Sequence, residues 1–252
     1  MSRSTDGLAR FEGRRALVLA HEPDGPAGQV GVRLEQRGFQ VITHIITHDY
    51  DDPQKFEQWP DFADYDLIVP MGSVRSLTRK HEAEWLEAEV ADLRAAHAAN
   101  TPILGVCFGG QLMTEALGGS IEPAPAATIG WRSIVDGRDG PNPAGPGPWM
   151  NWHHDRMVPP AGVEVLAETD TAVQIIRSGR TVGTQFHPEV DVEHVANWLN
   201  GASQEYLDEN GVDFDALLVE IGENEKRNIE QCAAFVDWYL DHVAFVESSA
   251  HG

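Results

Sequence analysis

Residues Pro102 to Gly119 read PILGVCFGGQLMTEALGG, and three pieces of different character follow one another in this stretch. A short apolar run leads into a turn bracketed by Gly105 and Gly109, and an amphipathic segment follows from Gln111 to Leu117. This order predicts a strand, a tight turn and a helix, with Cys107 at the turn. A residue at such a turn takes a sparsely populated backbone conformation that pushes its side chain out of the sheet. Strand and helix pass so close together that glycine is needed on both sides of the turn.

Cys107 is the candidate nucleophile of this turn. It precedes a predicted helix, whose free N–H groups and positive dipole end favour a thiolate over a thiol. Two other interpretations stay open from this stretch alone. A cysteine in an apolar run can be an inert core residue, and glycine-rich turns between strand and helix also bind phosphate. The phosphate site is the weaker alternative, because the stretch has neither a G-x-G-x-x-G pattern nor a P-loop lysine.

The composition restricts the class of protein. The 252 residues are 42% hydrophobic, which is enough for one domain with a sizeable core. A net charge of −22, from 40 acidic and 18 basic side chains, disfavours nucleic acid as a partner and favours solubility. No apolar run has the length of a membrane span and no cofactor motif is evident, so we expect no membrane contact, no cofactor and no metal. Only two cysteines occur, Cys107 and Cys232, and nothing near residue 1 resembles a secretion signal, so we expect a cytoplasmic protein with reduced thiols.

The first part of the chain alternates strand and helix patterns. Residues 1–15 are polar and are expected to form a flexible leader. Ala16 to Ala20 is an apolar run typical of a strand covered on both faces, Gly28 to Gly38 has helical spacing, and Gln40 to Thr47 is rich in β-branched residues. Strand, helix, strand is the opening of a parallel α/β sheet.

A third buried strand, Asp66 to Gly72, and an amphipathic helix around Leu86 to His97 lead up to Cys107. Cys107 therefore lies at the carboxyl end of a central strand, the edge of an open parallel sheet where sites form. Three polar residues could be drawn as metal ligands: His44, His48 and Asp49. Their spacing matches no standard metal site, and a half-buried strand accounts for them.

The second half of the chain has a different sequence pattern. Residues 137–148, GRDGPNPAGPGP, are expected to form a surface loop. Short β-type segments separated by turns predict antiparallel hairpins, and they are Trp149–Trp152, Val163–Ala167, Val173–Arg177 and Thr181–Phe186. From Val192 onward the sequence is acidic with apolar stripes at helical spacing, which predicts helices that cover a core and makes Cys232 a structural residue.

The last of these segments runs into His187-Pro188-Glu189. A cysteine nucleophile needs a general acid or base, and that residue needs a third group to orient it. Side chains two positions apart in an extended chain point to the same side, and the intervening proline keeps His187 extended. Together with Cys107, this pattern predicts a Cys-His-Glu constellation.

Three motifs of this chain resemble class I (triad-type) glutamine amidotransferase domains, among them the glutaminase domain of GMP synthase: Gly105–Gln111 (GVCFGGQ), Gly183–Glu189 (GTQFHPE) and Trp152–Asp155 (WHHD). The resemblance covers Ala16 to Trp198, with two motifs in the right order. It implies an α/β fold with a flavodoxin-like, mostly parallel sheet flanked by helices, a small antiparallel β addition and a helical C-terminal tail. We therefore expect a free-standing member, with the amidotransferase-like domain at residues 16–200 and a helical extension packed on it at residues 201–252.

The resemblance implies hydrolysis of a γ-carboxamide, with Cys107 as nucleophile, His187 as acid and base, and Glu189 as the group that orients His187. The thiolate would attack the amide carbon. His187 would protonate the departing amine and then activate water against the γ-glutamyl thioester. The backbone N–H groups of Gly72 and Phe108 would form the oxyanion hole.

The resemblance also implies that Gln111 contacts the substrate. The sequence departs from the family at the turn containing Gly72, where Gly-Gly-Pro is common, and at His154, which stands where a His-Gly-Asp element has glycine. These departures favour a substrate other than plain glutamine. His153 and His154 either bind the substrate or belong to a polar loop packed against the Cys107 turn, and no spacing rule decides between these roles.

The resulting hypothesis is an amidohydrolase that acts on a small molecule, glutamine or a γ-glutamyl amide, in nitrogen metabolism. The alternative within the family is a glutaminase subunit that delivers ammonia to a separate synthase partner. The alternative from another class is a non-catalytic binding or regulatory module of the same fold. Loss of a triad residue would favour that module, and none is lost.

Overall fold

The structure is a computed structural model that describes residues 10–52 and 54–246. The strands are β1 (Arg15–Ala20), β2 (Gln40–Ile45), β3 (Leu67–Pro70), β4 (Ile103–Val106), β5 (Ser120–Arg132), β6 (Val135–Asp136), β7 (Trp149–Val158), β8 (Glu164–Glu168), β9 (Val173–Ser178) and β10 (Thr181–Thr184). The helices are α1 (Gly28–Gln36), α2 (Trp85–Ala98), α3 (Phe108–Ala116), α4 (Val192–Gly201), α5 (Gln204–Glu209) and α6 (Phe214–Tyr239). Short 3-10 turns lie at Phe62–Asp64 and Leu77–Glu82, and a π-helical turn, Leu240–Ala244, follows α6.

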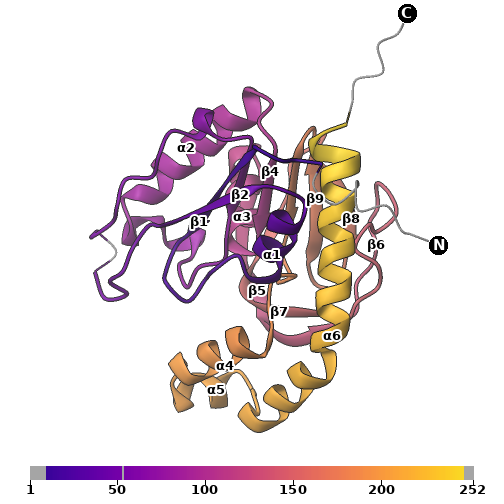
Figure 1. Ribbon diagram of the computed structural model, residues 1–252. Coiled ribbons are helices and arrows are strands. Elements are labelled where there is room, and N and C mark those ends of the chain that lie inside the picture. Colours follow the sequence, from indigo (N-terminus) through magenta and orange to yellow (C-terminus); the bar gives the residue numbers. More distant parts are fainter. Residues whose placement is uncertain (1–9, 53, 247–252) are drawn as a thin grey trace, which may run out of the picture.

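An eight-stranded sheet in the order β2-β1-β3-β4-β10-β9-β8-β6 forms the centre of the molecule (Figure 1). The first five of these strands are parallel, and the last three continue the sheet in antiparallel pairings. A separate antiparallel sheet pairs β5 with β7. The predicted α/β class, a mostly parallel sheet with a small antiparallel addition, is confirmed.

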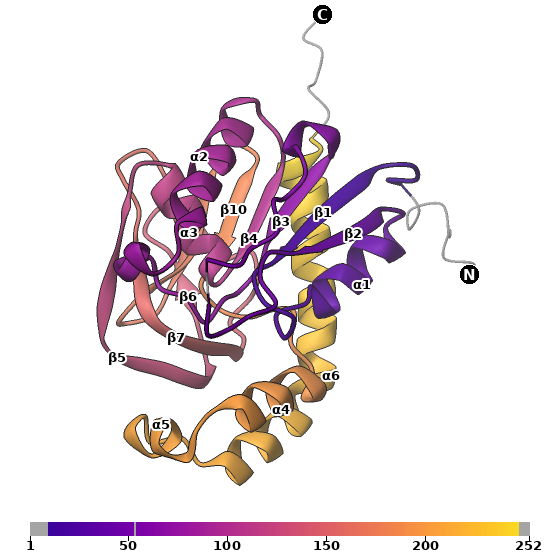
Figure 2. The same ribbon diagram turned by 90° about the vertical axis from the view of Figure 1, so that its left-hand side faces the viewer.

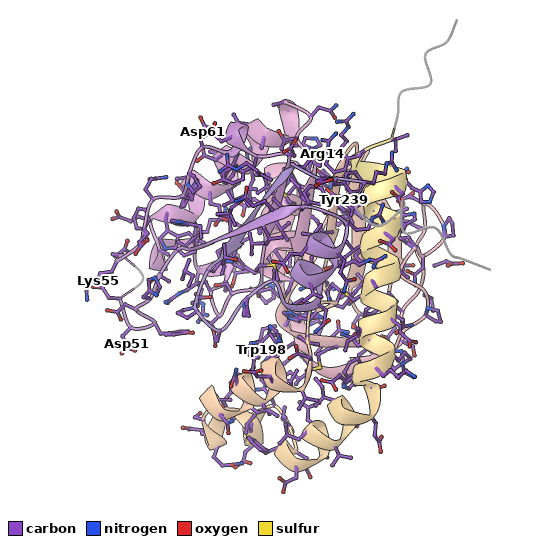
Figure 3. All side chains as sticks on the ribbon, in the orientation of Figure 1. Arg14, Asp51, Lys55, Asp61, Trp198 and Tyr239 are labelled. Carbon is purple, nitrogen blue, oxygen red and sulfur yellow. The ribbon has the colours of Figure 1, made fainter. Side chains whose placement is uncertain are left out.

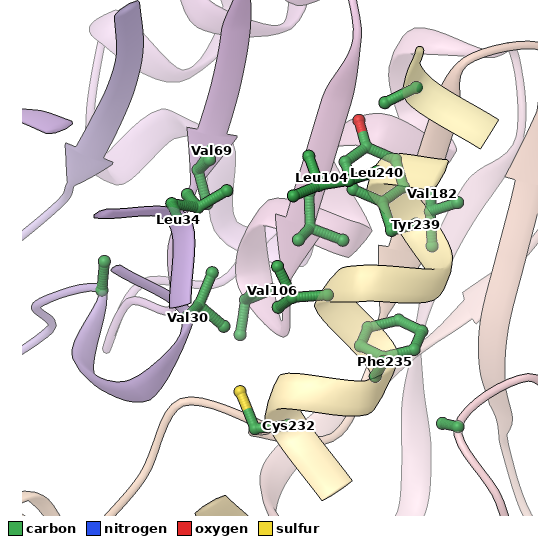
Figure 4. Packing of buried hydrophobic residues seen from close by; sticks show 14 of the residues in the cluster. Val30, Leu34, Val69, Leu104, Val106, Val182, Cys232, Phe235, Tyr239 and Leu240 are labelled. Atoms are coloured by element: carbon green, nitrogen blue, oxygen red, sulfur yellow. The ribbon is translucent and has the colours of Figure 1, made fainter. Parts of the chain in front are cut away.

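Helices cover both faces of the large sheet (Figures 1 and 2). Successive side chains of a strand point to opposite faces, so β4 contributes to two layers. Leu104 and Val106 pack with α1 and α6 on one face (Figure 4). Ile103 packs with α2 and α3 on the other. The near-continuous apolar sequence of the central strands follows from this double burial.

Helix α6 contributes directly to the core of the sheet. Cys232, Phe235 and Tyr239 are fully buried, and Figure 4 shows them facing the strands. Burial raises the pKa of the Cys232 thiol, so this cysteine is protonated and plays a structural part, as the sequence predicts. None of the described helices combines the length and the apolar character needed to cross a bilayer.

The amino-terminal leader differs from its prediction where it is described. Residues 1–9 lie outside the described residues, but residues 10–15 are ordered against the sheet. Phe11 is 2% exposed and its ring stacks on Phe39 at a centroid distance of 5.0 Å. Arg15 already belongs to β1. An aromatic ring in a polar segment is what anchors residues 10–15 to the core.

The small sheet extends beyond the β-type segments that the sequence predicts. Strand β7 runs to Val158 instead of ending near Trp152, and its partner β5 occupies Ser120–Arg132. The register of this pair shifts between Pro123 and Thr128. Prolines and this irregularity interrupt the period-2 pattern of β5, which hides the strand from sequence analysis.

Candidate active site

Cys107 occupies a strained turn between β4 and α3. Its backbone has φ 52° and ψ −103°, a positive φ that a non-glycine residue adopts only under constraint from its surroundings. Its N–H donates to the Thr184 carbonyl oxygen at 2.8 Å. A Cβ built on Gly105 would lie 2.5 Å from the Gly109 carbonyl oxygen, so strand and helix approach as closely as the sequence predicts. Cys107 is thus held at the amino terminus of α3.

Strand pairing brings His187 to the same edge of the sheet. Strand β10 lies parallel to β4, with Thr184 opposite Val106, so both chains leave the sheet at neighbouring carboxyl ends. The His187 Nδ1 lies 2.7 Å from the Glu189 Oε1, and both side chains are buried. Since a carboxylate accepts, Nδ1–H donates this bond and leaves Nε2 as the other functional nitrogen.

Gly72 lies where Cys107 and His187 meet. A Cβ built on Gly72 would lie 3.2 Å from the His187 Cε1 and 4.0 Å from the Cys107 Cβ. Both residues therefore border the same small space, in which a side chain at position 72 would crowd the imidazole. Among the described residues, no backbone carbonyl accepts a hydrogen bond from the N–H of Gly72 or of Phe108.

The charge state of His187 follows from its neighbours. Burial alone would lower the pKa of this imidazole, but the charges of Cys107 and Glu189, and hydrogen bonds to both, raise it well above its ordinary value. These electrostatics favour an imidazolium at His187, beside Cys107 and Glu189. A cysteine beside a protonated histidine can serve as a nucleophile that has its proton donor at hand.

Two helices hold the His187-Pro188-Glu189 segment from behind. Asn228 of α6 donates from Nδ2 to the carbonyl oxygens of Pro188 at 3.1 Å and of Val190 at 2.9 Å. Gln29 of α1 donates its N–H to the Glu189 carbonyl oxygen at 2.9 Å. Sequence reasoning missed Asn228. The available signal was a polar residue within the apolar stripe of a helix that was expected to cover a core.

Two glutamines connect the site to the small sheet. Gln111, 4% exposed, donates from Nε2 to the Gln185 Oε1 at 3.3 Å and to the Asp155 carbonyl oxygen at 3.5 Å. Gln185 in turn places its Nε2 3.7 Å from the Cys107 Sγ. The sequence predicts Gln111 near the site but does not single out Gln185. An extended T-Q-F-H segment, in which residues two apart share a side, was the signal for it.

His153 and His154 point in opposite directions from β7. His153 is 4% exposed, with its Nδ1 at 2.9 Å from the Asp155 carbonyl oxygen and its Nε2 buried without a partner among the described residues. Burial lowers the pKa of His153 to about 4, so it is neutral at pH 7. His154 is exposed, and its Nε2 lies 2.7 Å from the Tyr206 hydroxyl on α5. Only His153 is therefore buried beside the site.

Aromatic rings cover the imidazole side of the site. Trp198 of α4 meets the His187 ring edge to face at 4.8 Å, and Figure 3 shows Trp198 on the side of α4 that faces the sheet. The carbonyl oxygen of Trp152 lies 4.0 Å from the Cys107 Sγ. Trp152 also donates from Nε1 to the Tyr206 hydroxyl at 2.9 Å. Within the described chain, no group of His, Cys, Asp or Glu side chains is arranged to hold a metal ion, at this site or elsewhere.

Solved structures share this fold. A glutamine amidotransferase from Thermotoga maritima superposes with a TM-score of 0.76 at 20% identity, over 92% of this chain and 100% of that one. Among curated sequences, the glutamine amidotransferase-like protein YfeJ of Salmonella typhimurium is 28% identical over 245 residues, which are 93% of this chain and 99% of that protein.

Related sequences also include GMP synthases described as glutamine-hydrolyzing. The enzyme of Thermus thermophilus is 34% identical over 140 residues, which are 50% of this chain and 27% of that protein, so this chain spans about a quarter of its length. The profile of the family "Glutamine amidotransferase class-I" matches residues 30–199, the segment that contains Cys107, His187 and Glu189. The chain therefore belongs to the class-I glutamine amidotransferase family and is a cysteine-dependent amidotransferase.

Proposed function

We propose that this protein hydrolyses the γ-carboxamide of glutamine or of a γ-glutamyl amide, with Cys107 as nucleophile, His187 as acid and base, and Glu189 as the residue that orients His187. One observation carries the proposal. Cys107 is held at positive φ before α3, at the same sheet edge as the buried His187–Glu189 pair, with Gly72 beside both. This arrangement supports covalent catalysis through a γ-glutamyl thioester.

The proposed reaction has two halves. The Cys107 thiolate attacks the carboxamide carbon, and the His187 imidazolium gives its proton to the departing nitrogen as the C–N bond breaks. Ammonia or an amine leaves, and the glutamyl group remains as a thioester on Cys107. Neutral His187 then takes a proton from water, whose oxygen attacks the thioester carbon, and glutamate leaves as the thiolate and the imidazolium are restored.

The oxyanion of each half-reaction needs two hydrogen-bond donors. We assign them to the N–H groups of Gly72 and Phe108, which no backbone carbonyl among the described residues occupies. One such donor contributes about 3 kcal/mol to the transition state. Phe108 is buried and Gly72 is half-buried, and this limited access of water supports a contribution of that size.

The glutamyl part of the substrate needs its own contacts. Gln111 and His153, both buried beside the Cys107 turn, are our candidates. Neutral His153 offers a free Nε2 acceptor, which suits an ammonium or amide N–H of the substrate. His154 is exposed and bonds the Tyr206 hydroxyl, so we assign it to the outer part of the site, where the leaving amine of a substituted amide would pass.

A second candidate function is delivery of ammonia to a separate synthase. The similarity to a quarter of a GMP synthase, described as glutamine-hydrolyzing, supports it. In that case turnover would rise when the synthase is present. A non-catalytic module remains the least supported role, because Cys107, His187 and Glu189 are all present and lie at one site.

Glutamate release tests the proposal. Purified wild-type protein is incubated with glutamine and with a panel of γ-glutamyl amides, and glutamate is measured. Cys107→Ser is expected to remove all turnover, whereas Cys232→Ser, at the other, structural cysteine, is expected to retain it. Turnover by Cys107→Ser at the wild-type rate would contradict the assigned nucleophile. Glutamine turned over far faster than every substituted amide would contradict a preference for substituted amides.

A further inference from the structure

A second buried histidine lies directly behind the site. His21 follows the carboxyl end of β1 and is fully buried, as is Glu89 of α2. The His21 Nδ1 lies 3.1 Å from the Gly72 carbonyl oxygen, and its Nε2 lies 3.2 Å from both carboxylate oxygens of Glu89. The reaction proposed above uses neither residue.

The partners of His21 define its protonation. A carbonyl oxygen and a carboxylate can only accept hydrogen bonds, so both ring nitrogens of His21 must carry protons. The imidazole is therefore an imidazolium, paired with Glu89. Burial lowers the pKa of His21, but the charge and hydrogen bond of Glu89, the charge of Glu22 and the bond to Gly72 outweigh burial and raise it.

His21 touches both residues that supply the proposed oxyanion donors. Besides its bond to Gly72, its ring meets the Phe108 ring edge to face at a centroid distance of 4.9 Å. On its other side it stacks on Trp85 of α2 at 5.8 Å. The imidazolium is thus fixed in place by α2 and in contact with the turn and the helix that border Cys107.

The Gly72 turn needs such a support. The Gly72 N–H belongs to the same peptide group as the Met71 carbonyl. That carbonyl oxygen accepts a hydrogen bond from the Gly109 N–H at 3.0 Å. The N–H of a trans peptide points away from its carbonyl, so this bond sets one side of Gly72. A glycine backbone rotates freely, and the His21 bond to the Gly72 carbonyl fixes the peptide on the other side.

We propose that the buried His21–Glu89 pair positions the Gly72 turn, so that the Gly72 N–H is preorganised to donate to the oxyanion. The proposal assigns His21 and Glu89 as positioning residues and rests on the proposed hydrolytic function. It also explains why an ion pair occurs in a layer of otherwise apolar contacts, where a pair lacking such a role contributes little to stability.

Two double variants isolate the hydrogen bond to Gly72. His21→Leu/Glu89→Leu removes both partners of the ion pair, so neither of the two is left as an unpaired charge. His21→Asn/Glu89→Leu is matched to it, but the asparagine amide can still donate to the Gly72 carbonyl. His97→Leu is the control, because His97 is also on α2, and its Nδ1 bonds the Thr181 Oγ1 at 2.8 Å at the far end of β10.

Three measurements are made on each full-length variant. Steady-state kinetics with the best γ-glutamyl substrate gives kcat and KM. Alkylation by iodoacetamide, which needs no oxyanion hole, reports the reactivity of Cys107. Amide hydrogen exchange of a peptide spanning residues 71–76 reports the order of the Gly72 turn.

The Leu/Leu variant is expected to lose kcat by about tenfold to a hundredfold, less than the full removal of a donor, with KM and the alkylation rate within about twofold of wild type. Its residues 71–76 should exchange faster. The Asn/Leu variant should recover most of kcat, and His97→Leu should behave as wild type.

Unchanged kcat and exchange in the Leu/Leu variant would overturn the inference, as would an equal loss of kcat in His97→Leu. If the wild-type protein itself turns over no γ-glutamyl amide, the proposed function fails separately. The exchange of residues 71–76 then still decides whether His21 and Glu89 hold the turn.

Discussion

Two buried histidines near Cys107 differ in charge state because their neighbours differ. Burial alone would lower the pKa of His187, but its interactions with Cys107 and Glu189 raise this pKa well above the ordinary value. His153 has a single hydrogen-bond partner, the Asp155 carbonyl, and burial dominates. A proton donor and a neutral acceptor thus lie in one site, which suits a reaction that must both bind and protonate nitrogen.

His153 makes the stability of the fold depend on pH. Its pKa of about 4 lies below that of an unfolded histidine, so the unfolded chain binds more protons between about pH 6.5 and 4. The free energy of unfolding therefore keeps its full value above this window and decreases by about 3 kcal/mol in total as the pH falls through it. His153→Asn should therefore lose less stability than wild type between pH 7 and pH 4.

Urea unfolding at both pH values measures this difference directly. The exposed neighbour His154→Asn is the matched control and should follow the wild-type pH dependence. Equal pH dependence in His153→Asn and wild type would show that His153 is not neutral in the folded protein.

Gly72 is predicted to tolerate no side chain. A Cβ at this position would lie 3.2 Å from the His187 Cε1, so Gly72→Ala should displace the imidazole and lower kcat by tenfold or more, about 1.4 kcal/mol in the barrier. Gly222 of α6 has no atom within 4 Å of a built Cβ, and Gly222→Ala should leave kcat unchanged. Steady-state kinetics compares the two, and an unchanged kcat in Gly72→Ala would mean that position 72 does not adjoin the reacting atoms.

At the scale of elements, the site depends on the parallel pairing of β4 with β10. This pairing brings the chain that follows residue 184 beside Cys107, and α6 then holds the His187-Pro188-Glu189 segment through Asn228. The proposed catalytic groups therefore come from the ends of two neighbouring strands at one edge of the sheet, and they are supported by a helix that contributes no group to the site itself.

Asn228→Leu is expected to weaken both stability and turnover. It leaves the buried carbonyls of Pro188 and Val190 without their donor, which costs about 2–6 kcal/mol for two groups. It also frees the segment that carries His187, so kcat should fall. Asn224→Leu, one turn earlier on the same helix, is the control for urea unfolding and kinetics, because among the described residues the Asn224 side chain bonds only within α6, to the Glu220 carbonyl oxygen and to Arg227. If the Asn228 and Asn224 variants are equally stable and active, α6 does not support the site in this way.

The elements around Cys107 and His187 were predictable from local sequence patterns. Features that depend on contacts between distant parts of the chain were not. The Gly105–Gly109 turn and the extended segment before His187 each show their geometry within a few residues. Strand β5 was hidden, because its prolines and its register shift against β7 break the alternation on which strand prediction depends. Asn228 stands out as a polar residue in an apolar stripe, but its role could not be predicted, because its partners Pro188 and Val190 lie 40 and 38 residues earlier in the chain.

At the scale of the molecule, one core joins the sheet to the last long helix. Phe235 of α6 is fully buried and its ring lies 6.0 Å from that of Phe186, the residue before His187. The apolar cluster between the sheet and α6 contains residues from distant parts of the chain, among them Phe11 and Ala144. The helical segment after residue 200 and the parallel sheet should therefore unfold together.

Phe235→Ala tests that cooperativity. Removal of a fully buried phenylalanine should lower the free energy of unfolding by about 3–5 kcal/mol and keep a single transition. Ile229→Ala, on the exposed side of α6, should cost about 0.5 kcal/mol or less. Urea unfolding followed by both far-UV circular dichroism and tryptophan fluorescence would reveal two separate transitions if α6 were an independent unit.

The nucleophile assignment is tested most directly by the mass of the intact protein after incubation with an electrophilic glutamine analogue. The account predicts a single adduct on wild-type protein and on Cys232→Ser, no adduct on Cys107→Ala, and loss of glutamate release in step with labelling. An adduct that persists in Cys107→Ala, or full labelling of Cys107 with undiminished turnover, would contradict the assignment of Cys107 as the nucleophile.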